Sequence, residues 1–73
     1  MYYFITELDA RPDGIINNSL TNRSSLANGL SYYYDRASKA VTSTQFTGVA
    51  LTLQDEQGTI ILNEHFGTIY EAE

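Results

Sequence analysis

A single stretch with helical periodicity, flanked on each side by two strand-like segments, is the feature that most limits how this chain can fold. Apolar residues recur at steps of three and four from Leu26 to Val41, the spacing of one face of an α-helix. Aromatic, β-branched or alternating patterns typical of strands occupy residues 2–8, 15–20, 46–54 and 59–66. The order β-β-α-β-β predicts an α+β fold, a four-stranded antiparallel sheet with one helix packed on one face.

Length and cysteine content restrict the fold further. The chain has 73 residues and no cysteine, which predicts one small domain over residues 1–73, held together by packing without disulfides. A domain of this size buries only about 60% of the surface of its unfolded chain. Its stability is therefore marginal, and self-association or a partner would add to it.

The buried stripe of the helix is expected to contain Leu26, Leu30, Tyr33, Ala37 and Ala40, widened by Ala27, Tyr34 and Val41. We expect the helix to begin within residues 21–25, where several side chains are suitable N-caps, and to end in the polar run 42–45. Three consecutive tyrosines cannot all face one core, because neighbouring helical positions point about 100° apart. Tyr32 is the one expected to project outward, whereas Gly29 is interpreted as a packing concession.

Two turns are predicted from proline and glycine. Pro12, Asp13 and Gly14 favour a tight reversal, followed by a strand that is short and at a sheet edge. Residues 55–58 form the loop of a second hairpin. A four-residue loop places Leu53 opposite Ile60, and a three-residue loop with a glycine bulge places Leu53 opposite Ile61. Burial of the aliphatic side chains favours the first register.

Enzymatic chemistry is not indicated by the sequence. The one histidine, His65, has no serine and carboxylate spaced to suggest a nucleophilic triad, and we expect it at a strand end facing solvent. The acidic residues lack the spacing of a metal site, and no glycine pattern indicates a phosphate cradle. We therefore expect no enzyme activity, no cofactor and no metal.

The charge of the chain disfavours nucleic acid as a partner. Its formal net charge is −5, and the only cations are Arg11, Arg23, Arg36 and Lys39, too few for a phosphate-binding patch. No apolar run reaches the roughly 18 residues of a membrane span, and the start of the chain does not resemble a signal peptide. We expect a cytoplasmic protein without membrane contact.

One helix can cover only one face of a four-stranded sheet, so the other face is expected to be polar or to meet a partner. Tyrosine is enriched at such contacts. We expect the candidate interaction residues on the outer helix face and on the uncovered sheet face, where His65 and Tyr70 are also placed. The candidates are Tyr32, Asp35, Arg36, Lys39, Tyr3, Ile5 and Ile61.

The turn at Pro12-Asp13-Gly14, the helix rich in alanine, serine and tyrosine, and the hairpin through Asp55-Glu56-Gln57-Gly58 resemble small accessory proteins of bacteriophages and prophages. The resemblance implies a cytoplasmic, dimeric protein, and it includes inhibitors of host defence, some acidic enough to mimic DNA. Because four cations balance the scattered acids, we do not expect DNA mimicry here.

Two functions follow as hypotheses. The first is a small acidic, non-enzymatic protein-binding module, an inhibitor or adaptor of the phage type that acts as a homodimer. The alternative is a module that binds or sequesters an anionic metabolite or nucleotide in a cleft lined by tyrosines and by an arginine, either Arg11, Arg23 or Arg36.

Overall fold

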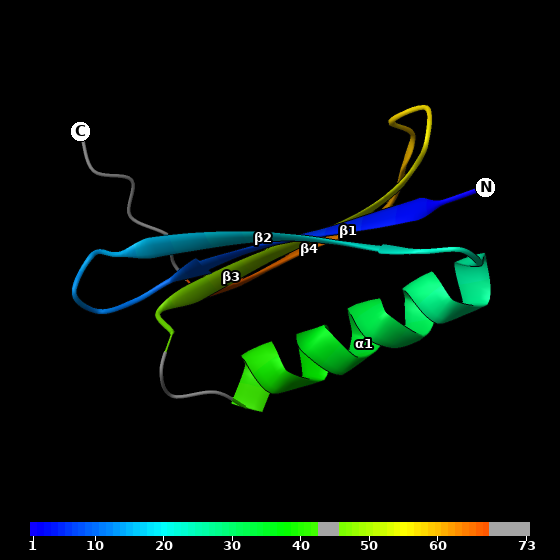
Figure 1. Ribbon diagram of the computed structural model, residues 1–73. Helices are drawn as coiled ribbons and strands as arrows, with labels where there is room; N and C mark the ends of the chain where they lie inside the picture. The colour runs from blue at the N-terminus through cyan, green and yellow to red at the C-terminus, as the bar shows by residue number, and fades with distance from the viewer. Residues whose placement is uncertain (43–45, 68–73) are drawn as a thin grey trace.

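The computed structural model describes residues 1–42 and 46–67 and confirms the α+β fold (Figure 1). The first hairpin consists of β1 (Tyr3–Ala10) and β2 (Ile16–Arg23). One helix, α1 (Leu26–Thr42), leads to the second hairpin, formed by β3 (Gly48–Asp55) and β4 (Ile60–Gly67). The helix cap is Ser25, whose hydroxyl accepts a hydrogen bond of 3.1 Å from the amide of Asn28. The helix start thus agrees with the expected cluster.

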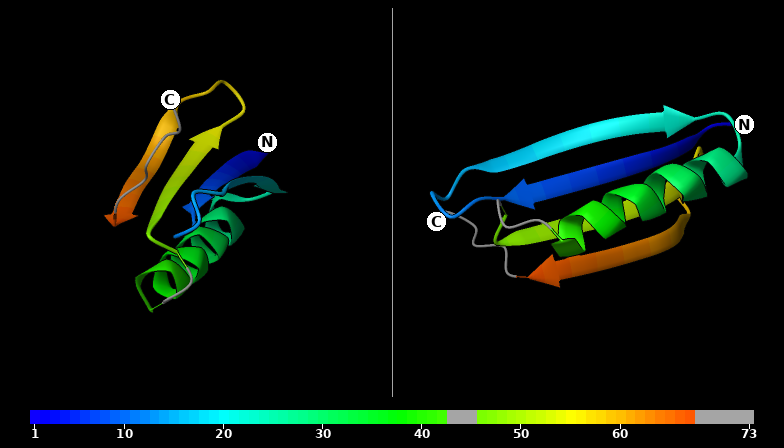
Figure 2. Two further views of the ribbon diagram at one scale, coloured as in Figure 1. Left: turned by 90° about the vertical axis from the view of Figure 1, so that its left-hand side faces the viewer. Right: turned by 90° about the horizontal axis from the view of Figure 1, so that it is seen from below.

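The four strands form one antiparallel sheet in the order β2-β1-β3-β4, so the two hairpins join through their first strands, β1 and β3. Helix α1 runs along one face and packs mainly on β3 and β1 (Figure 2). Among the described residues, no helix or strand lies on the other face of the sheet (Figure 1). We call this second surface the open face.

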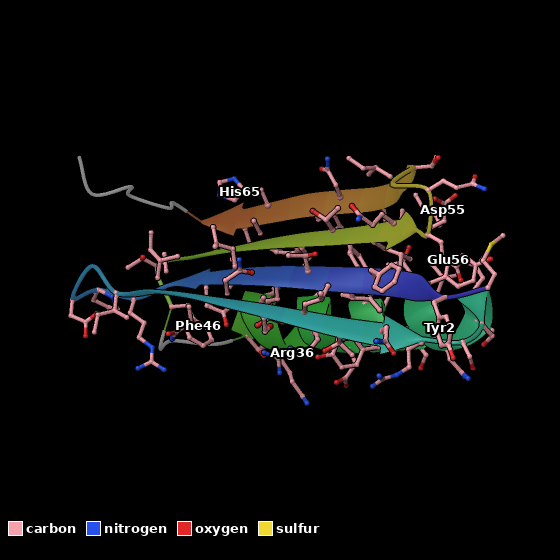
Figure 3. All side chains as sticks on the ribbon, turned by 45° about the horizontal axis from the view of Figure 1, so that its top comes forward. Tyr2, Arg36, Phe46, Asp55, Glu56 and His65 are labelled. Atoms are coloured by element: carbon pink, nitrogen blue, oxygen red, sulfur yellow. The ribbon has the colours of Figure 1, made fainter. Side chains whose placement is uncertain are left out.

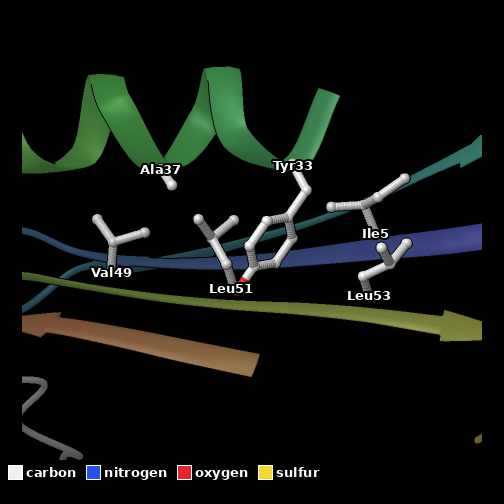
Figure 4. Close-up of a cluster of buried hydrophobic side chains, with 6 residues drawn as sticks. All are labelled: Ile5, Tyr33, Ala37, Val49, Leu51 and Leu53. Atoms are coloured by element: carbon white, nitrogen blue, oxygen red, sulfur yellow. The ribbon is translucent and has the colours of Figure 1, made fainter. Parts of the chain in front are cut away.

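The hydrophobic core lies between α1 and the two central strands (Figure 4). Tyr33 and Ala37 project from the helix, Ile5 comes from β1, and alternate residues of β3 complete the cluster. The β3 contribution is Val49, Leu51 and Leu53. Burial of one such large side chain contributes about 1.5–3 kcal/mol, so this single layer supplies most of the apolar stabilisation.

The helix presents a different edge to the sheet from the one predicted. Tyr33 and Ala37 are buried as expected, but Tyr34 is 54% exposed and Val41 is also exposed. The stripe widens instead toward Gly29, which is buried and has no side chain to hold the helix away. A Cβ atom at Gly29 would lie 3.4 Å from Leu53 Cδ1, an ordinary van der Waals contact, so the packing at this position does not require glycine.

The first hairpin confirms the turn and the edge position of its second strand. Gly14 has a φ of 88°, and the carboxylate of Asp13 accepts a hydrogen bond of 3.0 Å from the amide of Ile15. The expectation of a short β2 was wrong, because it pairs with β1 over eight residues. Hydrogen bonding to β1 along its whole length satisfies the backbone groups on that side of β2, despite its asparagine and serine side chains.

The second hairpin has a register that differs from both alternatives. Asp55 and Thr59 close the turn, and Gly58 adopts a φ of 85°, as in a three-residue loop with a glycine bulge. A further bulge at Ile61 then places Leu62 opposite Leu53. The extra residue returns Leu62 to the helix side, so the requirement for burial is met by a bulge and not by the loop length.

Ile69, Tyr70 and the acidic end of the chain are expected from the sequence to extend the last strand briefly, and these residues lie outside the described ranges. No helix within residues 1–42 and 46–67 is long and apolar enough to cross a membrane.

Candidate functional site

Among residues 1–42 and 46–67, no formally charged side chain lies on the open face. Strand pairing fixes which side chains share it, because residues opposite one another in the register lie on the same side of the sheet. Its members from β1 and β3 are Phe4, Thr6, Leu8, Ala10, Gly48, Ala50, Thr52 and Gln54. The edge strands add Ile16, Asn18, Leu20, Asn22, Ile60, Asn63, His65 and Gly67. The charged side chains that the structure describes therefore lie on the helix, the turns and the covered face.

Apolar side chains on the open face are exposed chiefly along its margins. Leu20 on β2 is 68% exposed, and Ile60 on β4 is 56% exposed. Ile61, at the bulge, is also exposed. Figure 3 shows the side chains standing on this face, with His65 projecting from β4. Exposed aliphatic side chains beside uncharged polar ones are typical of a surface that another molecule covers.

Side-chain size changes along the strands of the open face. Phe4, Gln54 and Ile60 lie at the end next to the β3–β4 turn. At the opposite end, the corresponding positions are Ala10 and two glycines, whereas the edge strand β2 has Ile16 there and Asn22 beside Phe4. Over β1, β3 and β4 the face therefore has large side chains at one end and small ones at the other.

Two of the predicted interaction residues lie on the wrong side of the sheet. Ile5 is 1% exposed and belongs to the core beneath α1, and Tyr3 packs against the same cluster. Both were expected on the uncovered face. That assignment was wrong, because the side of β1 that contains Tyr3, Ile5 and Glu7 faces the helix and Glu7 goes inward with the two apolar residues.

The helix residues that were predicted to contact a partner are only partly free to do so. Tyr32 is half-buried, its hydroxyl lies 3.2 Å from the hydroxyl of Thr21, and the guanidinium of Arg23 stacks 4.6 Å from its ring. Tyr34, and not Tyr32, is therefore the outward tyrosine. Asp35 and Lys39 form the expected exposed pair at 3.1 Å.

Arg36 forms an ion pair with the buried carboxylate of Glu7. Its Nε and Nη2 donate hydrogen bonds of 2.6 Å to the two carboxylate oxygens of Glu7, which is 4% exposed. These bonds hold the pKa of Glu7 below its ordinary value, although burial acts in the opposite direction. No sequence pattern indicates this pair, because only the fold brings the middle of β1 beneath the middle of α1.

Asp9 lies beside this pair on the same face of β1, and one of its carboxylate oxygens is buried without a hydrogen-bond partner among the described residues. Burial, reinforced by the neighbouring Glu7 carboxylate, raises the pKa of Asp9 to about 6. A pocket of about 330 Å³ opens here. Its lining consists of Glu7, Asp9, Arg36, Lys39, Ala40, Phe46 and Val49.

The arginines considered for anion recognition do not converge. Arg11 follows β1 in the first turn, Arg23 ends β2, and Arg36 is paired with Glu7. The pocket that contains Arg36 also holds two carboxylates, which repel an anion. Arg23 and Tyr32 line a separate pocket of about 380 Å³ together with Asn28, Ser31 and Asp35, and the Asp35 carboxylate there also opposes an anion.

His65 and the covered carboxylates lie on opposite faces of the sheet. His65 pairs with Ala50 on the open face, whereas Glu7 and Asp9 pair with Leu51 and Val49 on the helix side. A histidine separated from a carboxylate by the sheet cannot share a hydrogen bond with it. In the described part of the chain, no three His, Asp or Glu side chains gather closely enough to hold a metal ion.

Comparison with known proteins returned no match to a family model, to a curated protein or to a solved structure. The resemblance to phage accessory proteins therefore stays a prediction. Function has to be argued from the surface and the charges of this chain alone.

Proposed function

We propose that this protein is a non-enzymatic protein-binding module and that the open face is its recognition surface. The observation that carries the proposal is the complete separation of charge from this face. Half of the sheet surface is free of formal charge in a chain whose net charge is −5. Charged side chains are depleted at the centres of protein interfaces, because their desolvation is costly.

The composition of the open face supports protein as the partner class. Phe4, Leu8 and Leu20 supply apolar contact, and Thr6 and Thr52 supply hydroxyls at its centre. Such a surface offers nothing that would neutralise phosphates. An inhibitor or adaptor role, which the phage resemblance implies, would use the surface in this way.

The outer helix face becomes the secondary candidate. Arg36 and Tyr32 are held by Glu7 and by Thr21, so they are not free to reorganise around a partner. Asp35 and Lys39 neutralise one another. We therefore place the principal contact on the sheet.

The test compares binding by two variants of equal charge. Ala50→Glu puts a carboxylate at the centre of the open face, whereas Ser31→Glu puts one on the exposed side of α1. Proteins captured from cells that make this chain are quantified by mass spectrometry for the parent and both variants. We expect Ala50→Glu to lose partners that Ser31→Glu retains. Equal capture by both variants would contradict the proposed surface.

A further inference from the structure

We propose that the open face binds a second copy of this chain, forming a face-to-face homodimer whose two-fold axis runs across the strands. The inference rests on the proposed function, since it names the partner for the same surface. Charge, area and the size gradient of the face support it separately.

Charge favours the open face as the place where two copies meet. Each copy has a net charge of −5, so association through most surfaces would bring acidic side chains together. In the part of the chain that the structure describes, the open face can be removed from water without desolvating a formally charged side chain. Two acidic copies can therefore approach closely there at the lowest electrostatic cost.

The area of the open face is sufficient for a small dimer. Strands of eight residues are about 27 Å long, and four of them side by side are about 19 Å wide. The flat footprint is thus about 500 Å² per copy, and the side chains add to it. Two copies bury about 1,000 Å² or more, which is the lower limit for a specific interface.

The gradient in side-chain size favours one of the two possible two-fold axes. In face-to-face packing the two-fold axis lies in the plane of the interface, and residue i contacts j where j contacts i. An axis across the strands lays the end with large side chains of one copy over the end with small ones of the other. Phe4 then faces Ala10 of the second copy, and Ile60 faces its Gly67. On β1 and β4 large side chains thus meet small ones, as close packing of two sheets requires, whereas at the edge Asn22 of β2 faces Ile16.

An axis along the strands gives a poorer fit. It places β1 of one copy over β3 of the other, so Phe4 faces Gln54 at one end and Ala10 faces Gly48 at the opposite end. Two large side chains would collide while two small ones leave a void. The gradient along β1, β3 and β4 therefore favours the axis across the strands.

Light scattering after size exclusion tests the dimer. We expect the parent to have twice the chain mass of 8.2 kDa, Ser31→Glu to match it, and Ala50→Glu to dissociate at least about tenfold more readily. Circular dichroism checks that each variant folds, and Leu20→Glu, at an exposed margin position, replaces Ala50→Glu if that variant unfolds.

A parent that stays monomeric at 0.5 mM would overturn the dimer while leaving capture of other proteins by the open face intact. A dimer that Ala50→Glu and Leu20→Glu both preserve would overturn the open face as its interface. Loss of captured partners without any change in mass would support the proposed function and reject the second copy as its partner.

Cross-linking tests the operator, because the chain has no cysteine of its own. Leu20→Cys mixed with Asn18→Cys forms a disulfide-linked heterodimer if the axis runs across the strands. Leu20→Cys mixed with Asn63→Cys does so only if the axis runs along them. Cross-linking of the second mixture in preference to the first would reject the proposed arrangement.

Discussion

At the scale of single residues, the Asp9 carboxyl has an unfavourable environment on the covered face of the sheet. Burial raises its pKa from 3.8 to about 6, so the folded chain binds the proton more tightly than the unfolded chain does. The carboxyl therefore costs no stability below about pH 4, and its destabilising effect grows as pH rises through 6. Asp9→Asn removes an ionised group that has an unpaired buried oxygen.

We expect Asp9→Asn to raise the free energy of unfolding at pH 7.5 by about 1–2 kcal/mol and to change it little at pH 4. Urea unfolding at the two pH values measures the difference. Asp35→Asn, in an exposed pair, is the control and should stay within about 0.5 kcal/mol of the parent at both. A gain for Asp9→Asn that is equal at pH 4 and 7.5 would show that ionisation is not its cause.

Tyr33 presents a second buried polar group at the residue scale. Its side chain is fully buried, and its hydroxyl has no hydrogen-bond partner among the described residues. Burial raises its pKa, and the charge of Glu64 adds to the effect. We expect Tyr33→Phe to stabilise the fold by up to about 1 kcal/mol, because it removes an unsatisfied group and keeps the ring. Tyr34→Phe, on the exposed side, should have little effect, and a clear loss for Tyr33→Phe would reveal a bond to its hydroxyl.

At the scale of elements, the bulge at Ile61 determines which face each β4 side chain occupies. Ile60 and Ile61 together oppose one residue of β3, so deleting one isoleucine leaves a regular hairpin with Leu62 still opposite Leu53. We expect this deletion to change the free energy of unfolding by less than about 1 kcal/mol. Deleting Asn63 instead turns Leu62 or Phe66 away from the helix and should cost about 3 kcal/mol or more. Thermal unfolding compares the two, and equal losses would contradict the role of the bulge.

Element types were predictable because each depends on local periodicity, but their orientation was not. The stripe from Leu30 to Ala37 specified a helix, whereas the pairing of Arg36 with Glu7 decided which side of it faces the sheet. A charged residue at position 36 carries no local sign that a buried carboxylate will neutralise it. The same pair drew Glu7 inward and, through alternation, fixed Ile5 in the core.

The existence of an uncovered sheet face was predictable from the sequence, but the residues that lie on it were not. One helix beside four strands requires an uncovered face, and the structure has one. Tyr3 and Ile5 were assigned to it, yet the apolar residues of β1 divide between the two faces as Ile5 and Leu8 do. Only the cross-strand register reveals that the described charged side chains of the sheet share the covered face.

At the scale of the whole molecule, the protein is two layers thick, with Cα extents of 37 × 27 × 14 Å. One layer of side chains forms its core, so the open face represents apolar area that a monomer leaves in water. A second copy would convert the structure into four layers, helix, sheet, sheet and helix. Stability would then rise with protein concentration, as it does for any association that requires the folded state.

The salt dependence of the dimer Kd distinguishes this dimer from one held together by ion pairs. Because each copy has a net charge of −5 and the interface contains no charge, the long-range term between copies is repulsive. Raising NaCl from 10 to 150 mM shortens the Debye length from about 30 to about 8 Å and screens that repulsion. We expect the dimer Kd, measured by sedimentation equilibrium, to fall several-fold over this range and to fall more for Ser31→Glu, which adds a charge outside the interface. A Kd that rises with salt would mean that opposite charges join the copies, and the contact would then lie on the helix or the turns, where this chain keeps its cations.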